Sequence, residues 1–99
     1  MAWACRAGES LWYAAAYHAR SGQVTGCRGL LARATMETAH GVLAGQRRWV
    51  LNEKRCVEQA GLAGVDALLG GAAGVGAELE SLCREVRTRL EAALPLIGA

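Results

Sequence analysis

The sequence predicts an all-α protein, folded as an antiparallel helical bundle of three long helices and one short one. Two observations support this prediction: twenty of the 99 residues are alanine, and Pro95, close to the C-terminus, is the single proline. Alanine is the strongest helix former and proline the strongest helix breaker, so almost the whole chain favours helix. A chain of this length supports one hydrophobic core, so we expect residues 1–99 to form a single helical domain.

The first helix is predicted over residues 2–20, where apolar side chains recur at helical spacing. The predicted apolar stripe consists of Trp3, Ala7, Leu11, Ala14 and Tyr17. Gly22 permits the chain to turn after this helix, and Ser21 is a candidate cap for the next one.

The second helix is predicted over residues 23–48. Its apolar face keeps a period of about 3.6 residues and consists of Val24, Cys27, Leu31, Ala34, Thr38 and Val42. Four glycines interrupt this helix: Gly26, Gly29, Gly41 and Gly45. Each costs up to ~1 kcal/mol relative to alanine, so we expect a neighbouring helix to approach closely and compensate.

A short third helix is predicted from Glu53 to Ala60, capped by Asn52 and ended by Gly61. The glycine-rich residues 61–76 are predicted to be a connection, with one or two helical turns over Val65–Leu69 as the alternative.

The last helix is predicted to stop at Pro95. Its apolar seam consists of Val75, Leu79, Leu82, Cys83, Val86, Leu90, Ala93 and Leu94. Its outer face offers the i,i+4 charge pairs Glu80–Arg84, Glu85–Arg89 and Arg87–Glu91. The predicted core of the bundle contains Val24, Leu31, Val42, Trp49, Leu79, Leu82, Val86 and Leu90.

Charge and cysteine content bear on partners and compartment. The formal net charge of +2 is too small to indicate a nucleic-acid binder. The four cysteines lie far apart without a C-x-x-C pair, so no zinc site is predicted, and Cys27 and Cys83 are expected to be buried thiols. Reduced thiols are typical of the cytoplasm. The longest uncharged run, residues 67–77, is eleven residues long, short of the ~20 that a membrane helix needs.

Motifs for self-sufficient catalysis are missing from the sequence. Metal-dependent phosphoryl transfer uses paired carboxylates, and Asp66 is the single aspartate. No phosphate-binding loop or dinucleotide fingerprint is present. We therefore expect no metal, no cofactor and no catalysis by this chain alone.

Two local patterns are candidate sites. In residues 47–55 four cations flank Trp49 and a predicted helix start, whose free N–H groups attract anions. The candidate substrate- or partner-binding residues there are Arg48, Trp49, Asn52, Glu53 and Lys54. The alternative is structural: Trp49 fills the core and the cations form a solvated collar.

The second pattern is Arg33 and His40, separated by six residues and therefore about two helical turns apart. This spacing matches the Arg–His signature of helical HEPN-type ribonucleases, in which the two residues act on an RNA phosphodiester. A packed or surface histidine is the alternative interpretation.

The segments Val24–Cys27, Leu30–Ala34 and Arg48–Lys54 carry a family resemblance. Over residues 22–62 the chain resembles the C-terminal helical domain of bacterial polymerase-β-like nucleotidyltransferases, which is related in fold to HEPN domains and to the kanamycin-nucleotidyltransferase C-terminal domain. The resemblance implies a domain that helps to shape an acceptor pocket beside a separate catalytic domain carrying paired aspartates, which this sequence lacks. Asn52, Glu53 and Lys54 are the positions it transfers, with Arg33 less secure.

The sequence therefore predicts a non-catalytic helical binding domain or subunit of nucleotidyltransferase type, which contributes acceptor-substrate or partner contacts. The alternatives are a HEPN-like ribonuclease using Arg33 and His40, or a plain protein–protein interaction domain. A nucleotidyltransferase catalytic domain is the expected partner, and nucleic acid is expected only in the ribonuclease case. A homodimer is predicted, through the last helix or through Trp3 and Trp12, because an alanine-rich core buries little apolar area.

Overall fold

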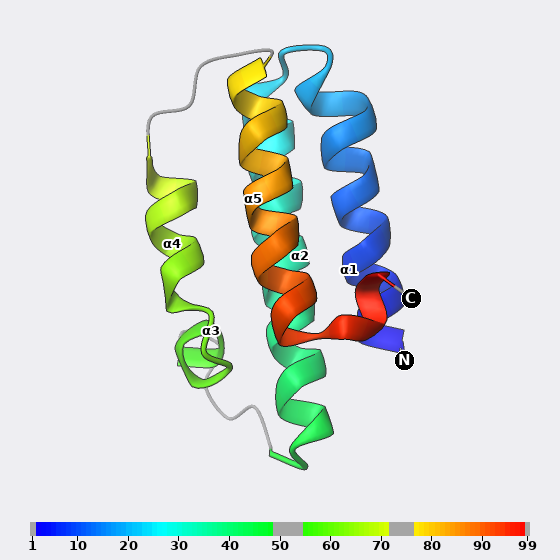
Figure 1. The fold of residues 1–99 in the computed structure, drawn as a ribbon, viewed down its shortest axis with the longest axis vertical. Helices are drawn as coiled ribbons and strands as arrows, with labels where there is room; N and C mark the ends of the chain where they lie inside the picture. The colour runs from blue at the N-terminus through cyan, green and yellow to red at the C-terminus, as the bar shows by residue number, and fades with distance from the viewer. Residues whose placement is uncertain (1, 49–54, 72–76, 99) are drawn as a thin grey trace.

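The structure is a computed structural model that describes residues 2–48, 55–71 and 77–98. Every regular element in these residues is helical, which confirms the all-α prediction (Figure 1). The elements are α1 (Ala2–Tyr13), the π-helix η1 (Ala14–Ala19), α2 (Val24–Gly45), α3 (Cys56–Gln59), α4 (Ala63–Gly70), α5 (Ala77–Ala93) and the 3-10 helix η3 (Pro95–Gly98).

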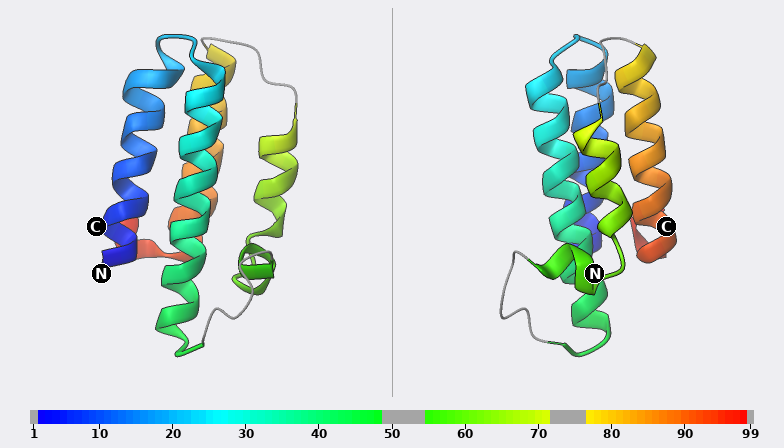
Figure 2. Two further views of the ribbon diagram at one scale, coloured as in Figure 1. Left: turned by 180° about the vertical axis from the view of Figure 1, so that it is seen from behind. Right: turned by 90° about the vertical axis from the view of Figure 1, so that its left-hand side faces the viewer.

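Three long helical segments, which we call legs, lie side by side (Figures 1 and 2). The first leg is α1 with its continuation η1, the second is α2 and the third is α5. The chain runs along α1, returns along α2, turns back through α3 and α4, and descends along α5. Because the α3–α4 leg lies between them in the sequence, α2 and α5 touch while running in the same direction. The C-terminal η3 crosses beneath the bundle and packs against α1.

The core lies between these legs and consists largely of small and aliphatic side chains. Five of the predicted core residues are buried: Leu31, Leu79, Leu82, Val86 and Leu90. Val24 is half-buried at the edge of the core, and Trp49 lies outside the described residues. On the C-terminal part of α2 the buried residue is Leu43, where Val42 was predicted. The predicted apolar face is shifted by one residue at this end of α2, because the buried face continues through Ala39 and Leu43.

The turns follow the glycines. Gly22 has φ +69° and Gly61 has φ +77°, the left-handed conformation that glycine adopts without strain. Ser21 does not cap α2 as predicted. Its hydroxyl donates to the Tyr17 carbonyl at 2.7 Å, so it closes the preceding helix. The N-cap position of α2 is Gln23, which makes no side-chain capping bond.

The predicted connection over residues 61–76 contains a helix of its own, α4, which corrects the sequence prediction. Val65 of α4 is buried in the core, so the segment contributes apolar contacts in spite of its glycines. The guanidinium of Arg28 on α2 donates to the carbonyls of Leu69 and Gly71 at the end of α4. These carbonyls lack partners within their own helix, so Arg28 satisfies them and holds α4 against α2.

The glycines of α2 divide into two kinds. A Cβ at Gly26 would lie 2.5 Å from His18 Nδ1, and one at Gly41 would lie 2.7 Å from Leu94 Cδ2. A Cβ at Gly29 or Gly45 would meet no atom within 4 Å. The predicted close approach is therefore confirmed at the first two positions and wrong at the other two.

Candidate functional site

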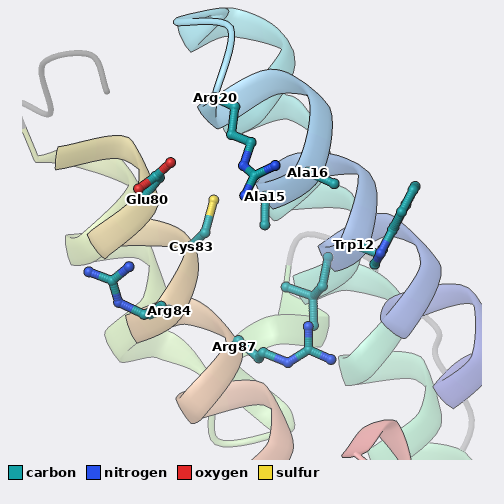
Figure 3. A pocket seen from close by; sticks show the side chains of 9 residues that line it. Trp12, Ala15, Ala16, Arg20, Glu80, Cys83, Arg84 and Arg87 are labelled. Carbon is teal, nitrogen blue, oxygen red and sulfur yellow. The ribbon is translucent and has the colours of Figure 1, made fainter. Parts of the chain in front are cut away.

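A cavity of about 630 Å³ lies between the first leg of the bundle and α5, and we call it the arginine groove (Figure 3). Its lining residues come from α1, from η1 and the residue after it, and from four positions of α5. They are Leu11, Trp12, Ala15, Ala16, Arg20, Glu80, Cys83, Arg84 and Arg87.

Helical spacing explains how α5 contributes to the groove. Positions 80, 83, 84 and 87 recur at three and four residues, so their side chains share one face over two turns. On the opposite wall Ala15 and Ala16 have short side chains, which leaves the space between the legs open. In Figure 3, Arg20 and Cys83 point into this space from opposite sides, and Arg87 extends from α5 toward α1. The guanidinium of Arg84 is directed away from Arg20, so Arg84 contributes to the rim of the groove.

The π-helix η1 decides which residues of the first leg face inward. In an α-helix, residues 17 and 18 would lie on the same face as Ala14, one turn further along the chain. The wider π-turn instead places residue 19 on that face. Ala19 is accordingly fully buried, and Tyr17 is 54% exposed. The predicted stripe is therefore wrong at Tyr17, because an α-helical period does not hold beyond Tyr13.

The groove carries more positive than negative charge. Arg87 Nε lies 2.7 Å from Glu91 Oε1, so this guanidinium already has a partner. Within the described residues Arg20 and Arg84 make no ion pair, and the predicted pairs Glu80–Arg84 and Glu85–Arg89 do not form there. Arg20 and Arg84 are both exposed, so their guanidinium groups are available to a ligand.

Two thiols meet at the floor of the groove. Cys83 Sγ lies 3.4 Å from Cys27 Sγ, and both residues are buried, as the sequence predicted. Burial disfavours the thiolate, and together with the adjacent Cys27 thiol it raises the pKa of Cys83 to about 12. Cys83 is therefore a neutral thiol at neutral pH and a poor nucleophile.

A smaller cavity of about 180 Å³ lies on the other side of α1, against α2. Its residues are Arg6, Glu9, Ser10, Tyr13, Leu30, Arg33 and Glu37. The buried Glu37 carboxylate accepts a hydrogen bond from Ser10 Oγ at 2.7 Å and lies 3.6 Å from Arg33 Nε. Glu37 is thus satisfied within the fold.

The structure places Arg33 and His40 in different surroundings. Arg33 is exposed beside Glu37, while the His40 ring stacks on Trp3 with centroids 4.7 Å apart. Seven residues of α-helix separate the two side chains by about 10 Å along the axis. The ribonuclease role of this pair stays a prediction.

Most of the predicted site in residues 47–55 lies outside the described residues: Trp49, Asn52, Glu53 and Lys54. Arg48 is described and exposed, and its Nη1 donates to the Gln59 carbonyl at 3.4 Å. This contact ties the end of the α2 leg to α3. The binding role of the segment stays a prediction.

The described residues contain neither a cluster of potential metal ligands nor a helix that could span a membrane. Nowhere in them do three or more side chains that could ligate a metal come together. No helix in the same residues has both the length and the apolar character needed to cross a membrane.

Comparisons of the chain with family models, with curated proteins and with solved structures gave no match. The residues that line the arginine groove are therefore the basis for the function proposed below.

Proposed function

We propose that the chain is a non-catalytic helical binding domain whose arginine groove holds an anionic ligand. The observation that carries this proposal is Arg20, which points into the cavity and, within the described residues, makes no ion pair (Figure 3). Arg84, at the rim of the cavity on α5, makes no ion pair within the described residues either. A guanidinium group offers a planar fork of N–H donors that suits phosphate and carboxylate groups. The half-buried Ala15 and Ala16 on the opposite wall offer apolar surface to the rest of the ligand.

The chemistry of the lining residues favours binding over catalysis. Glu80 is the single carboxylate among the residues that line the groove, and Cys83 is protonated at neutral pH. The lining therefore offers neither a carboxylate pair for general acid–base catalysis nor a thiolate nucleophile.

A nucleotidyltransferase-type role is the second candidate, and it is supported by the resemblance over residues 22–62. In that role the domain contacts an acceptor or partner beside a separate catalytic domain, through the candidate residues of segment 47–55: Arg48, Trp49, Asn52, Glu53 and Lys54. A cytoplasmic location is proposed with it, supported by the two buried thiols at the groove floor.

The test is a calorimetric titration with inorganic pyrophosphate at low salt. We expect Arg20→Gln and Arg84→Gln each to weaken binding about tenfold or more, because each removes charge-assisted hydrogen bonds. Arg89→Gln is the matched control: it makes the same charge change on α5 at a position that does not line the groove. Circular dichroism verifies that each variant keeps its helix content.

The outcomes separate the two candidate anion sites. If the double variant Arg48→Gln, Lys54→Gln loses pyrophosphate binding and the groove variants keep it, the anion site lies in residues 47–55 and the groove proposal is wrong. If the Arg89→Gln control loses as much affinity as the groove variants, binding reflects net charge alone, and the groove proposal is wrong as well.

A further inference from the structure

Three aromatic side chains gather on the outside of the first leg of the bundle, and we call them the aromatic cluster. They are Trp12, Tyr13 and Tyr17, exposed by 54%, 43% and 54% respectively. Trp12 meets both tyrosines edge-on, with ring centroids 5.1 and 5.7 Å away, and the two tyrosine rings stack at 5.6 Å. An exposed aromatic side chain forgoes the free energy that burial of its apolar surface would give. A cluster of three such side chains therefore indicates a surface that contacts another molecule.

The cluster lies between two cavities that contain arginines. Trp12 lines the arginine groove together with Arg20, Arg84 and Arg87. Tyr13 lines the smaller cavity on the other side of α1 together with Arg6 and Arg33. The aromatic cluster is therefore flanked by cavities that contain arginines on both sides of α1. In the smaller cavity Arg6 lies over the Trp3 ring and Arg33 beside Glu37, so a ligand there competes with these contacts.

We propose that the aromatic cluster and its two flanking cavities bind single-stranded nucleic acid, with bases stacked on the rings and phosphates held by the arginines. The inference rests on the proposed function, because the arginine groove supplies part of the phosphate contacts. Stacking platforms beside a cationic groove are the physical basis of single-strand binding without sequence preference. Each base has a flat apolar face for the rings, and each linkage has one negative charge for a guanidinium.

Charge and shape favour a single strand over other occupants. A duplex keeps its bases stacked inside, where exposed rings on a helix cannot reach them. The sequence did not predict nucleic acid because the net charge is only +2, whereas the fold gathers arginines from α1, α2 and α5 around one aromatic cluster. Three carboxylates, those of Glu9, Glu37 and Glu80, line the same two cavities. Arg33 is paired with Glu37 and Arg87 with Glu91, so we expect moderate affinity that falls steeply with salt.

The decisive variants are at Tyr17, which belongs to the cluster and lines neither cavity. Tyr17→Phe keeps the ring and should bind like the parent. Tyr17→Leu keeps an apolar side chain but removes the stacking face, and we expect about a fivefold to hundredfold loss, the range for one stacked base. Leu96→Ala changes an exposed apolar side chain elsewhere and should have no effect.

The experiment measures fluorescence anisotropy of labelled oligouridylate and oligothymidylate, with unlabelled duplex DNA as competitor. We expect both single strands to bind, the duplex to compete poorly, and log affinity to fall with log salt with a slope of about −2 for three phosphate contacts.

Three results would overturn the inference. If Tyr17→Leu binds the oligonucleotides like the parent, the rings do not stack on bases. If pyrophosphate binds in the groove and neither oligonucleotide binds, the proposed function stands and the nucleic-acid inference fails. If sedimentation shows a dimer that Tyr17→Ala dissociates while oligonucleotide binding is absent, the cluster is an interface with a second copy.

Discussion

At the scale of single residues, the glycines of α2 offer a matched experiment. Gly29→Ala places a methyl group in open space and gains helix propensity, so we expect it to stabilise the protein by up to about 1 kcal/mol. Gly41→Ala forces a methyl group to 2.7 Å from Leu94 Cδ2 and 3.1 Å from Trp3 Cβ, so we expect a loss of about 1 to 3 kcal/mol from overpacking. Urea unfolding of the two variants measures both free energies.

The opposite signs are the test. Two stabilising substitutions would mean that Leu94 and Trp3 do not pack tightly over Gly41. Two destabilising substitutions would mean that Gly29 also lies under a neighbouring chain.

At the scale of elements, the sequence predicts well where periodicity and packing agree. The α5 helix has a strict apolar seam and a proline stop, and its predicted residues are buried between Leu79 and Leu90. The α2 helix follows its predicted face for about four turns, up to Thr38, and departs by one residue at Leu43. Local pattern suffices here because each helix buries one stripe against the same core.

The rest could not be predicted because it depends on contacts between distant segments. A run of alanines is compatible with α- and π-helical turns alike, so residues 14–19 carry no signal for η1. Glycines predicted a connection over residues 61–76, but Val65 anchors α4 in the core and the Arg28 guanidinium, from α2, holds the end of α4. The arginine groove was missed for a related reason: Arg84 was assigned to an i,i+4 pair on a solvent face.

Arg28 gives a prediction at this scale. Arg28→Met removes both donors to the Leu69 and Gly71 carbonyls, so we expect amide exchange in α4 to accelerate about 5- to 150-fold, equivalent to 1 to 3 kcal/mol of local opening. Arg33→Met is the control, because Arg33 lies on the same helix but does not contact α4. Exchange measured by NMR should be unchanged in α1 for both variants. Equal acceleration across all helices would contradict the anchoring role.

At the scale of the whole molecule, the buried thiol pair makes stability depend on alkaline pH. An unfolded Cys83 loses its proton near its ordinary pKa of 9.0, whereas burial holds the folded thiol protonated up to about 12. Below pH 9 both states are protonated and Cys83 contributes no pH dependence. Between pH 9 and 12 the unfolded state binds fewer protons, so the free energy of unfolding falls as pH rises, by at most about 1.4 kcal/mol per pH unit.

Cys83→Ala should remove this part of the slope, and Cys5→Ala, at an exposed cysteine, should keep it. Denaturant unfolding from pH 8 to 10.5 compares the slopes of the three proteins, since other groups that titrate there are common to all of them. Parallel curves for parent and Cys83→Ala would show that the folded thiol titrates like an unfolded one.

The homodimer stays a prediction. Of its two predicted interfaces, the α5 seam and the Trp3–Trp12 surface, the first is less favoured by the structure. The α5 seam, from Leu79 to Leu90, is buried within the chain's own core, so it is not free to meet a second copy. Trp12 remains exposed and Trp3 is half-buried under its stacking with His40. A second copy would therefore have to use the outside of α1.

The contact between Cys27 and Cys83 also sets an order of events in folding. These residues are 56 positions apart, while α1 and α2 are joined by a tight turn, so the α1–α2 hairpin closes a short loop and α5 a long one. Loop-closure entropy makes the long-range step slower. We expect docking of α5 on α2 to bury both thiols, so pulsed alkylation during refolding should protect Cys27 and Cys83 together, after the first helical signal has formed. Protection of the two thiols therefore reports the step in which the N-terminal and C-terminal parts of the chain form a common core.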